Sequence, residues 1–385
     1  MNNKNTIKKL LEENFAYLTS MSVKEYTLYR KWLDLKKKYT PKGQESKESF
    51  DDFFDESDVS SNPYPEFDRV KKNIWIPESP EDYLKLEPEL VLVANSNSEV
   101  STTWSILRDF CHGAIWHQSP GRLLRYYVID SVTKKYLGIL SMGSDFISVG
   151  GRDEVIKWTK EDRLGGRLKN TLMGSTIAAV QPFGYNYNGG KLMALLAASS
   201  TVAEQWEEQY KDKLVGVTTT SLYGGKSMYN RLKYWKKCKS TTGEIQIEPS
   251  EDVYDVARDW LSENYPEMVP KTPPGKKILS HPKYRYLVNI YKVCGIKPPI
   301  NNAPRGVYWN ELYVDTCPFL RNEISCVTEK RYDNRPEALT SLWKEMYAKK
   351  RINSLQKENR ISTDILFYDD IISMEWEEVK EKYLS

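Results

Sequence analysis

The chain has 385 residues, including 11 Trp and 26 Tyr, and its formal net charge is +3. This length is enough for two domains or for one domain with large extensions, and the aromatic residues can supply a well-packed core. No run approaches the ~18 consecutive apolar residues that a membrane-spanning helix needs, which excludes membrane insertion. The five cysteines are scattered, and no apolar signal segment opens the chain. We therefore expect a reduced cytoplasmic protein without a disulfide framework.

Charge is unevenly distributed over the first 65 residues. Residues 1–40 hold nine Lys or Arg against four Asp or Glu, and an apolar stripe from Leu10 to Leu18 predicts one or two helices. Residues 41–65 are Ser-rich, with seven acids and one Lys between Glu45 and Asp58. We interpret this stretch as a linker and a candidate for disorder. Such charged blocks are either solvated helices and linkers or arms that bind a partner.

Apolar runs and turn residues alternate between residues 66 and 249. The predicted elements are a strand at Leu90–Ala94, a helix at Ser98–Cys111, strands at Leu124–Asp130 and Tyr136–Met142, a charged helical segment at Asp153–Arg163, strands at Thr176–Gln181 and Leu214–Thr220, a helix at Lys226–Lys237 and a strand at Glu244–Glu248. The short polar turn between the second and third strands favours a hairpin. This order predicts an α/β core with a mixed central sheet flanked by helices.

The remaining residues, 250–385, read as mainly helical with proline-rich breaks. The predicted helices are Val253–Asn264, Tyr284–Val293 and Glu337–Arg360. We therefore divide the chain into a basic helical segment (1–40), an acidic linker (41–65), an α/β core (66–249) and a helical C-terminal region (250–385).

A glycine-containing loop follows the strand that ends at Gln181. Gly184, Gly189 and Gly190 would let the backbone approach a ligand at the start of the next helix, where unpaired N–H groups bind anions. The spacing is neither the dinucleotide fingerprint nor a phosphate loop with Gly-Lys-Ser/Thr. The loop is therefore either a pyrophosphate site or a turn without a ligand.

The segment from Lys226 to Lys237 combines apolar, aromatic and basic residues. As a helix it would place Met228, Leu232 and Trp235 on one face, opposite Asn230, Lys233 and Lys237. Six basic residues and no acid lie between Lys226 and Lys239. The predicted nucleic-acid contacts are Lys226, Arg231, Lys233, Lys236 and Lys237, with Tyr229 and Tyr234 available to stack on bases. The alternative is an ordinary solvated face.

Tyr229, Asp153 and Glu161 are the candidate catalytic residues. A phenol with an ordinary pKa near 10 serves better as a proton donor than as a base, which gives Tyr229 the role of general acid. Asp153 and Glu161, together with Glu154, are candidates for the general base. At helical spacing such carboxylates alternatively pair with Arg or Lys on the surface.

The sequence predicts no metal site. Cys111, His112 and His117 offer three ligands within seven residues, but no fourth ligand lies near them in the sequence and no Cys-x-x-Cys occurs. We interpret Cys111 as buried and the histidines as partly exposed. The absence of a Gly-x-Ser-x-Gly sequence argues against a serine hydrolase.

The order of elements in 66–249 resembles the core of GNAT-type acyltransferases. In that family, diverging strands and the following helix start hold the pyrophosphate of acetyl-CoA, and a tyrosine often serves as general acid. The resemblance assigns cofactor contacts to Gln181, Gly184, Gly189 and Gly190, with Asn186 in place of a second glycine, and the acid to Tyr229. Acetyl-CoA or another acyl donor would then be the cofactor.

A second resemblance covers most of the chain. It is carried by Leu124-Arg-Tyr126, Leu137–Ser141, Gly151-Arg-Asp153, Ile156-Lys-Trp158, Thr218–Gly224, Tyr229–Trp235 with Lys236-Lys237, Arg305–Tyr308 and Lys349–Ile352. These residues resemble the DruA family, which is named for a component of the Druantia anti-phage system and also occurs in phages and mobile elements. A more distant similarity is to phage Mom proteins, which modify adenine in DNA on a GNAT-like scaffold.

Three functional hypotheses follow. The first is a DruA-like protein that acts on DNA, as a Mom-like base-modifying acyltransferase. The second is a non-catalytic DNA-binding or assembly subunit of an anti-phage or phage system, with protein partners. The third is a small-molecule acetyltransferase.

Overall fold

The structure, a computed structural model, describes residues 3–39, 65–93, 98–111, 121–221, 227–272 and 282–384. Nearly all of the predicted acidic linker, as well as Lys226, lies outside these residues. Contacts divide the chain into two units, residues 1–29 with 242–303, and residues 30–241 with 304–383. The chain runs from one unit to the other along the paired strands β7 (Thr241–Gln246) and β8 (Ile300–Glu311). The division into four segments stays a prediction.

The larger unit is built on a mixed sheet. Its eight strands run in the order β1-β2-β3-β4-β5-β8-β6, with β7 paired to β8. The other strands are β1 (Pro88–Leu92), β2 (Leu123–Asp130), β3 (Tyr136–Ser144), β4 (Thr171–Ala179), β5 (Gly216–Ser221) and β6 (Trp235–Lys237). β4 and β5 are parallel, whereas β1–β2, β2–β3, β3–β4, β5–β8 and β6–β8 are antiparallel. The predicted α/β fold with a mixed central sheet flanked by helices is confirmed.

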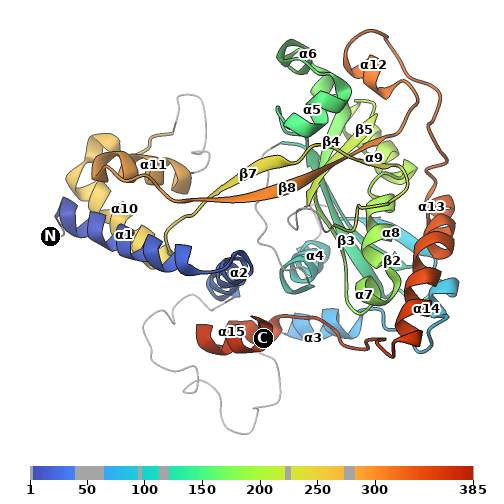
Figure 1. Cartoon of the computed structure of the whole chain (residues 1–385), viewed down its shortest axis with the longest axis horizontal. Helices are drawn as coiled ribbons and strands as arrows, with labels where there is room; N and C mark the ends of the chain where they lie inside the picture. Colours follow the sequence, from blue (N-terminus) through green and yellow to red (C-terminus); the bar gives the residue numbers. More distant parts are fainter. Residues whose placement is uncertain are drawn as a thin grey trace, which may run out of the picture. The chain divides into compact units, whose positions relative to one another are not determined.

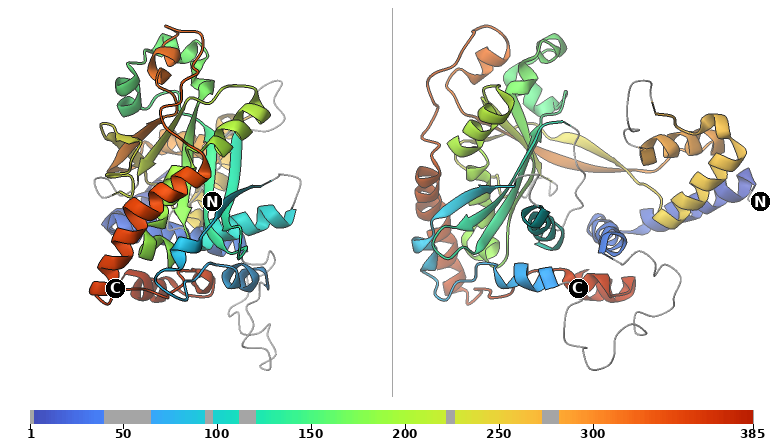
Figure 2. Two further views of the ribbon diagram at one scale, coloured as in Figure 1. Left: turned by 90° about the vertical axis from the view of Figure 1, so that its right-hand side faces the viewer. Right: turned by 180° about the vertical axis from the view of Figure 1, so that it is seen from behind.

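Helices cover both faces of this sheet (Figures 1 and 2). On one face α8 (Gly189–Leu196) contacts β3 and β4, and α13 (Pro336–Trp343) packs on its outer side. On the other face α4 (Ser98–Cys111) contacts β3. Leu192 to Leu196 are all buried because α8 lies between the sheet and α13. The further helices of this unit are α3 (Pro65–Lys72), α5 (Gly150–Ile156), α6 (Lys160–Leu164), α7 (Phe183–Tyr187), α9 (Ser200–Tyr210), α12 (Thr316–Leu320), α14 (Lys349–Lys357) and α15 (Trp376–Leu384).

The smaller unit is helical. It contains α1 (Lys4–Ser20), α10 (Glu251–Asn264) and α11 (Pro282–Cys294), and α2 (Val23–Tyr39) passes from this unit into the larger one. Ile7, Trp260 and Leu287 from the three helices meet in one apolar core. Asn3 caps the first helix by accepting a hydrogen bond of 2.9 Å from the Thr6 amide. The helices predicted in these segments are confirmed.

The prediction of a helix at 226–237 is wrong. The described part consists of turns that lead into the short strand β6. Arg231 and Tyr234 have φ values of +57° and +73°, a left-handed conformation that an α-helix cannot contain. Leu232 and Trp235 are nevertheless buried, and Met228 packs on the core. The sequence pattern therefore identified these apolar residues, but it identified neither the backbone that buries them nor the burial of Tyr229, which was expected to be available for base stacking.

Three further elements differ from the predictions. Strand β8 was not predicted, although it lies between β5 and β6 in the sheet. The predicted charged helix Asp153–Arg163 is split into α5 and α6, because Lys157 adopts a left-handed conformation with φ +60°. The long C-terminal helix is present, but a π-helical turn at Lys344–Ala348 separates α13 from α14.

Candidate functional site

The parallel strands β4 and β5 separate part-way along the sheet. Their register runs from Thr171 opposite Gly216 to Gly174 opposite Thr219 and then ends. Beyond this point β4 stays paired with β3, and β5 stays paired with β8, but the two strands no longer pair with each other. A register shift between β3 and β4 leaves Ser175 as an extra residue, which makes a β-bulge at the place of divergence. Ligands commonly bind where neighbouring parallel strands part at their carboxyl ends.

Hydroxyl groups and one buried cation surround the bulge. Ser175 is exposed within an otherwise mostly buried strand, and its Oγ lies 3.0 Å from Oγ of Ser141. Arg108 of α4 donates through Nε to Oγ1 of Thr176 at 3.1 Å. Burial lowers the pKa of Arg108 to about 10, so its guanidinium stays charged at neutral pH. These groups, which sequence reasoning missed, place hydroxyls and a charged guanidinium at the bulge, where they are engaged in hydrogen bonds within the protein.

Tyr229 lies at the last paired residues of the two strands. Its hydroxyl is 3.5 Å from Oγ1 of Thr219, and that Oγ1 donates to the carbonyl of Gly174 at 2.8 Å. Its ring packs against Trp235 and Tyr308 at centroid distances of 5.2 and 4.8 Å. Burial raises the pKa of Tyr229 above its usual value, so the phenol stays protonated at neutral pH. As a protonated phenol it can donate a hydrogen bond, and its raised pKa makes it a weaker acid than an ordinary tyrosine.

The segment from Ser227 to Lys239, the basic segment from here on, is fixed to the core through α8. Lys191 donates through Nζ to the carbonyls of Met228 at 2.6 Å and Asn230 at 2.8 Å. The indole of Trp235 donates to the Ala194 carbonyl at 3.1 Å. Burial lowers the pKa of Lys191 to about 8. Lys191 was not a predicted site residue, although a lysine directly after two glycines at a helix start could have been considered.

The cations of the basic segment point to solvent. Arg231, Lys233, Lys236, Lys237 and Lys239 are all exposed. Lys236 is paired with the buried Glu311 at 2.9 Å, and Lys239 with Glu154 at 2.6 Å. Among the described residues, Arg231, Lys233 and Lys237 have no ion-pair partner. Three of the predicted nucleic-acid contacts are therefore available to an anionic ligand, whereas Lys236 is already engaged.

The loop that the acyltransferase resemblance assigns to acetyl-CoA is internally satisfied. Gly184 N–H donates to the Val180 carbonyl at 2.8 Å, and Asn186 N–H to the Pro182 carbonyl at 3.0 Å. Tyr185 N–H donates to Oε1 of Gln181 at 2.8 Å. These amide groups are the ones that would have to hold a pyrophosphate at the start of α7. The residues present do not fit the pyrophosphate of acetyl-CoA at this loop.

Close packing within the protein explains why residues 189 and 190 are glycines. A Cβ on Gly189 would lie 2.4 Å from the buried ring of Phe183, and one on Gly190 would lie 2.7 Å from Sδ of Met228. Both glycines therefore permit close contacts within the protein. Their assignment to a ligand stays a prediction.

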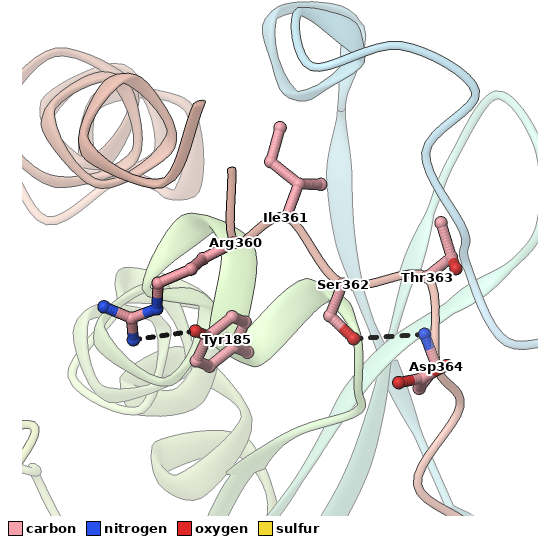
Figure 3. Close-up of a pocket in the computed structure, with 6 residues that line it drawn as sticks. All are labelled: Tyr185, Arg360, Ile361, Ser362, Thr363 and Asp364. Carbon is pink, nitrogen blue, oxygen red and sulfur yellow. Dashed lines mark hydrogen bonds between the residues drawn. The ribbon is translucent and has the colours of Figure 1, made fainter. Parts of the chain in front are cut away.

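An open hollow of about 440 Å³ lies beside the same loop (Figure 3). It is lined by Tyr185, Arg360, Ile361, Ser362, Thr363 and Asp364. Arg360 donates to the Tyr185 hydroxyl at 3.0 Å and forms an ion pair with Glu358 at 2.5 Å. The cation nearest the hollow is thus already partnered, and Tyr229 does not line it.

Asp153 belongs to a buried charge network. Arg152 donates to its Oδ1 at 2.6 Å, while Arg163 and the Val149 amide donate to Oδ2 at 3.0 and 3.1 Å. Arg152 also forms an ion pair with the buried Asp145 at 2.7 Å. Both carboxylate oxygens of Asp153 are occupied, which favours a structural role over that of a base. Glu161 is exposed on α6, and the contacts of Tyr229 among the described residues include neither carboxylate.

Comparison with known proteins now assigns the chain to a family. The family model described as Druantia protein DruA matches residues 78–273. The chain belongs to the DruA family. The Druantia protein DruA of Escherichia coli (strain UMEA 4076-1) is 30% identical over 158 residues, which cover 37% of this chain and 39% of that relative. No solved structure matches the chain.

The part of the chain matched by the DruA family model contains most of the candidate site. It includes Lys191, Tyr229 and the diverging strands β4 and β5, whereas β8 lies outside it. Helix α10 lies within the matched residues, whereas α1 lies outside them, since residues 1–77 are not matched.

The described residues of this DruA-family chain hold no group of three His, Cys, Asp or Glu side chains placed to bind a metal ion. Cys111 ends α4, but His112 and His117 lie outside the described residues. Burial raises the pKa of Cys111 to about 12, which leaves it a neutral thiol. None of the described helices is long and apolar enough to span a bilayer.

Proposed function

We propose that this protein acts on DNA in the cytoplasm as a component of an anti-phage or phage system. The observation that carries the proposal is the basic segment, in which Arg231, Lys233 and Lys237 are exposed and have no ion-pair partner among the described residues. The turns of this segment are held by Lys191 beside the divergence of β4 and β5. The exposed cations of the basic segment would bind the phosphate backbone of DNA. Such phosphate contacts fix the register and orientation of the DNA on the protein.

The family relationship supports the same proposal. The name of the matched family and of its Escherichia coli relative refers to Druantia, and anti-phage proteins meet foreign nucleic acid. Other proteins of such a system would be the protein partners. The matched residues cover under half of the relative, so the role of the relative is assigned to this chain only by inference.

Binding of a duplex tests this function. Wild-type protein should bind a labelled DNA duplex of about three helical turns at low salt, and Lys233→Glu combined with Lys237→Glu should weaken binding about tenfold or more. Lys72→Glu, an exposed position on α3, serves as the matched control and should bind like wild type. Wild-type protein that does not bind at low salt would overturn the proposal.

A second candidate function is modification of a DNA base at the divergence of β4 and β5. The observation that favours it is the protonated phenol of Tyr229, placed where the two strands part beside the Ser175 bulge. This divergence is also the feature that a GNAT-type resemblance implies. Tyr229 would give its proton to a departing group. Because the amides of Gly184, Tyr185 and Asn186 do not fit the pyrophosphate of acetyl-CoA, this candidate function does not specify the acyl donor.

Mass spectrometry of nucleosides distinguishes modification from binding alone. DNA from cells that express the protein should contain a new nucleoside that is absent with Tyr229→Phe. DNA of unchanged composition, together with intact duplex binding in vitro, would favour the non-catalytic subunit.

A further inference from the structure

Helix α11 of the smaller unit presents a face that stays exposed among the residues that the structure describes. Leu287, Ile290 and Tyr291 bury one side of the helix in the core shared with α1 and α10. On the other side Tyr284 is 57% exposed and Val288 is 42% exposed, one helical turn apart. Lys292, a further turn along, is also exposed. Two large apolar side chains and a cation thus line up along one outer face.

Charge separates α11 from the other helices of its unit. Helix α10 carries five carboxylates, Glu251, Asp252, Asp255, Asp259 and Glu263, against the single cation Arg258. Helix α1 pairs its lysines internally, as in Lys8–Glu12 at 3.8 Å and Lys9–Glu13 at 3.7 Å. Helix α11 carries Lys283, Arg285 and Lys292 and no carboxylate. Helix α11 has no carboxylate of its own, and because Lys283 is already paired with Glu248 and Glu251, Lys292 is the cation that lies in line with Tyr284 and Val288.

The ends of α11 are firmly held. Lys283, near its first residue, forms an ion pair with Glu248 at 3.2 Å and is bonded to Glu251 at the start of α10. At the other end Gly295 adopts φ +67°, and the Ile296 amide donates to the Tyr291 carbonyl at 3.0 Å. A helix anchored at both ends keeps its outer face in one orientation relative to its own unit.

We propose that the outer face of α11 is a second DNA contact, which enters the major groove of a duplex. The groove is about 12 Å wide and admits one α-helix of about 10–12 Å diameter. Lys292 would contact phosphate, and Tyr284 and Val288 would contact base edges and thymine methyl groups. The inference rests on the proposed action on DNA but uses a surface separate from the basic segment.

Duplex binding by the full chain tests the inference. The apolar variant Tyr284→Ala with Val288→Ala should weaken binding about tenfold, with the salt dependence unchanged because no phosphate contact is lost. Lys292→Glu should also weaken binding and should reduce the slope of log K against log salt by about 1. Val256→Ala, which truncates an apolar side chain that is 40% exposed on the acidic helix α10, is the matched control and should bind like wild type.

The outcomes separate this inference from the proposed function. Normal binding by the α11 variants, with weakened binding by Lys233→Glu/Lys237→Glu, would overturn the α11 contact and leave the proposed function standing. Loss of a protein partner by the α11 variants, with DNA binding intact, would equally overturn it and identify the face as a protein interface. No binding by the wild type would overturn both. Circular dichroism of each variant establishes that the helices remain folded.

Discussion

The hydroxyl of Tyr229 lies 3.5 Å from Oγ1 of Thr219, at the last residue pair before β4 and β5 part. Thr219 in turn donates to the Gly174 carbonyl, directly before the Ser175 bulge. A residue from the basic segment is thereby placed at the one parallel junction among the described strand pairs. This arrangement joins two features that are more than 50 positions apart in the sequence, the bulged strand and the aromatic, cationic segment.

Tyr229 offers a test that separates chemistry from packing. Tyr229→Phe keeps the buried ring and loses a hydroxyl at the limit of hydrogen-bond distance, so its free energy of unfolding should stay within about 1 kcal/mol of wild type. Protection against phage, or the yield of a modified nucleoside, should fall sharply. Tyr229→Ala should cost about 3–5 kcal/mol because it opens a cavity. Full activity of the phenylalanine variant would remove Tyr229 from the chemistry.

Asp153 should behave as a structural residue. Asp153→Asn leaves the buried Arg152 and the partly buried Arg163 without their shared carboxylate, which should lower the free energy of unfolding by about 3–5 kcal/mol. The exposed Glu161 provides the comparison, since Glu161→Gln should change stability by less than about 0.5 kcal/mol. Urea unfolding measures both variants. An Asp153→Asn protein that is as stable as wild type but inactive would restore Asp153 as a catalytic candidate.

Gly189 should be required for packing. A Cβ at this position would meet Phe183, which is fully buried and cannot move away, so Gly189→Ala should cost about 1–3 kcal/mol. Gly150→Ala is the matched control, because a Cβ there would have no heavy atom within 4 Å. The melting temperatures of Gly189→Ala and Gly150→Ala test this prediction. Equal melting temperatures would show that a Cβ at residue 189 is accommodated without loss of stability.

Lys191 should make stability depend on pH. Burial lowers its pKa from 10.5 to about 8, so between these values the unfolded chain binds a proton that the folded chain has lost. The free energy of unfolding contributed by this group therefore rises with pH through that window. Relative to Lys191→Met, wild type should gain stability from pH 8 to pH 10.5. If the difference in the free energy of unfolding between wild type and Lys191→Met stays constant from pH 8 to pH 10.5, the pKa of Lys191 is not lowered in the folded protein.

Several elements follow from local sequence patterns. The alternating strands around the turn at 131–135 and the helix Ser98–Cys111 match the structure closely, because burial on one face imposes a simple period. The predicted strand Thr176–Gln181 overlaps only the second half of β4, and the parallel pairing of Thr171–Gly174 with β5 was not predicted. The sequence also indicated that Leu232 and Trp235 are buried and that Lys233 and Lys237 are exposed, whereas the burial of Tyr229 was not predicted.

The other features of the fold and the candidate site depend on contacts between residues that are far apart in the sequence. β8 is separated from the core sequence by the smaller unit, and no local pattern indicates that residues 300–311 insert between β5 and β6. The segment expected as a helix becomes turns and a strand because β6 pairs with β8 and Lys191 fixes the turn carbonyls. The bulge at Ser175 depends on the register with β3, which the sequence of β4 alone does not specify.

The most direct test of DNA contact through the basic segment is the salt dependence of duplex binding, measured for wild type and for Lys233→Glu/Lys237→Glu. Each phosphate contact contributes about −0.9 to the slope of log K against log salt. We predict a clearly negative slope for wild type and a slope shallower by about 2 for the double variant, with Lys72→Glu unchanged. Identical slopes for wild type and the double variant, or no binding at 50 mM salt, would contradict the account.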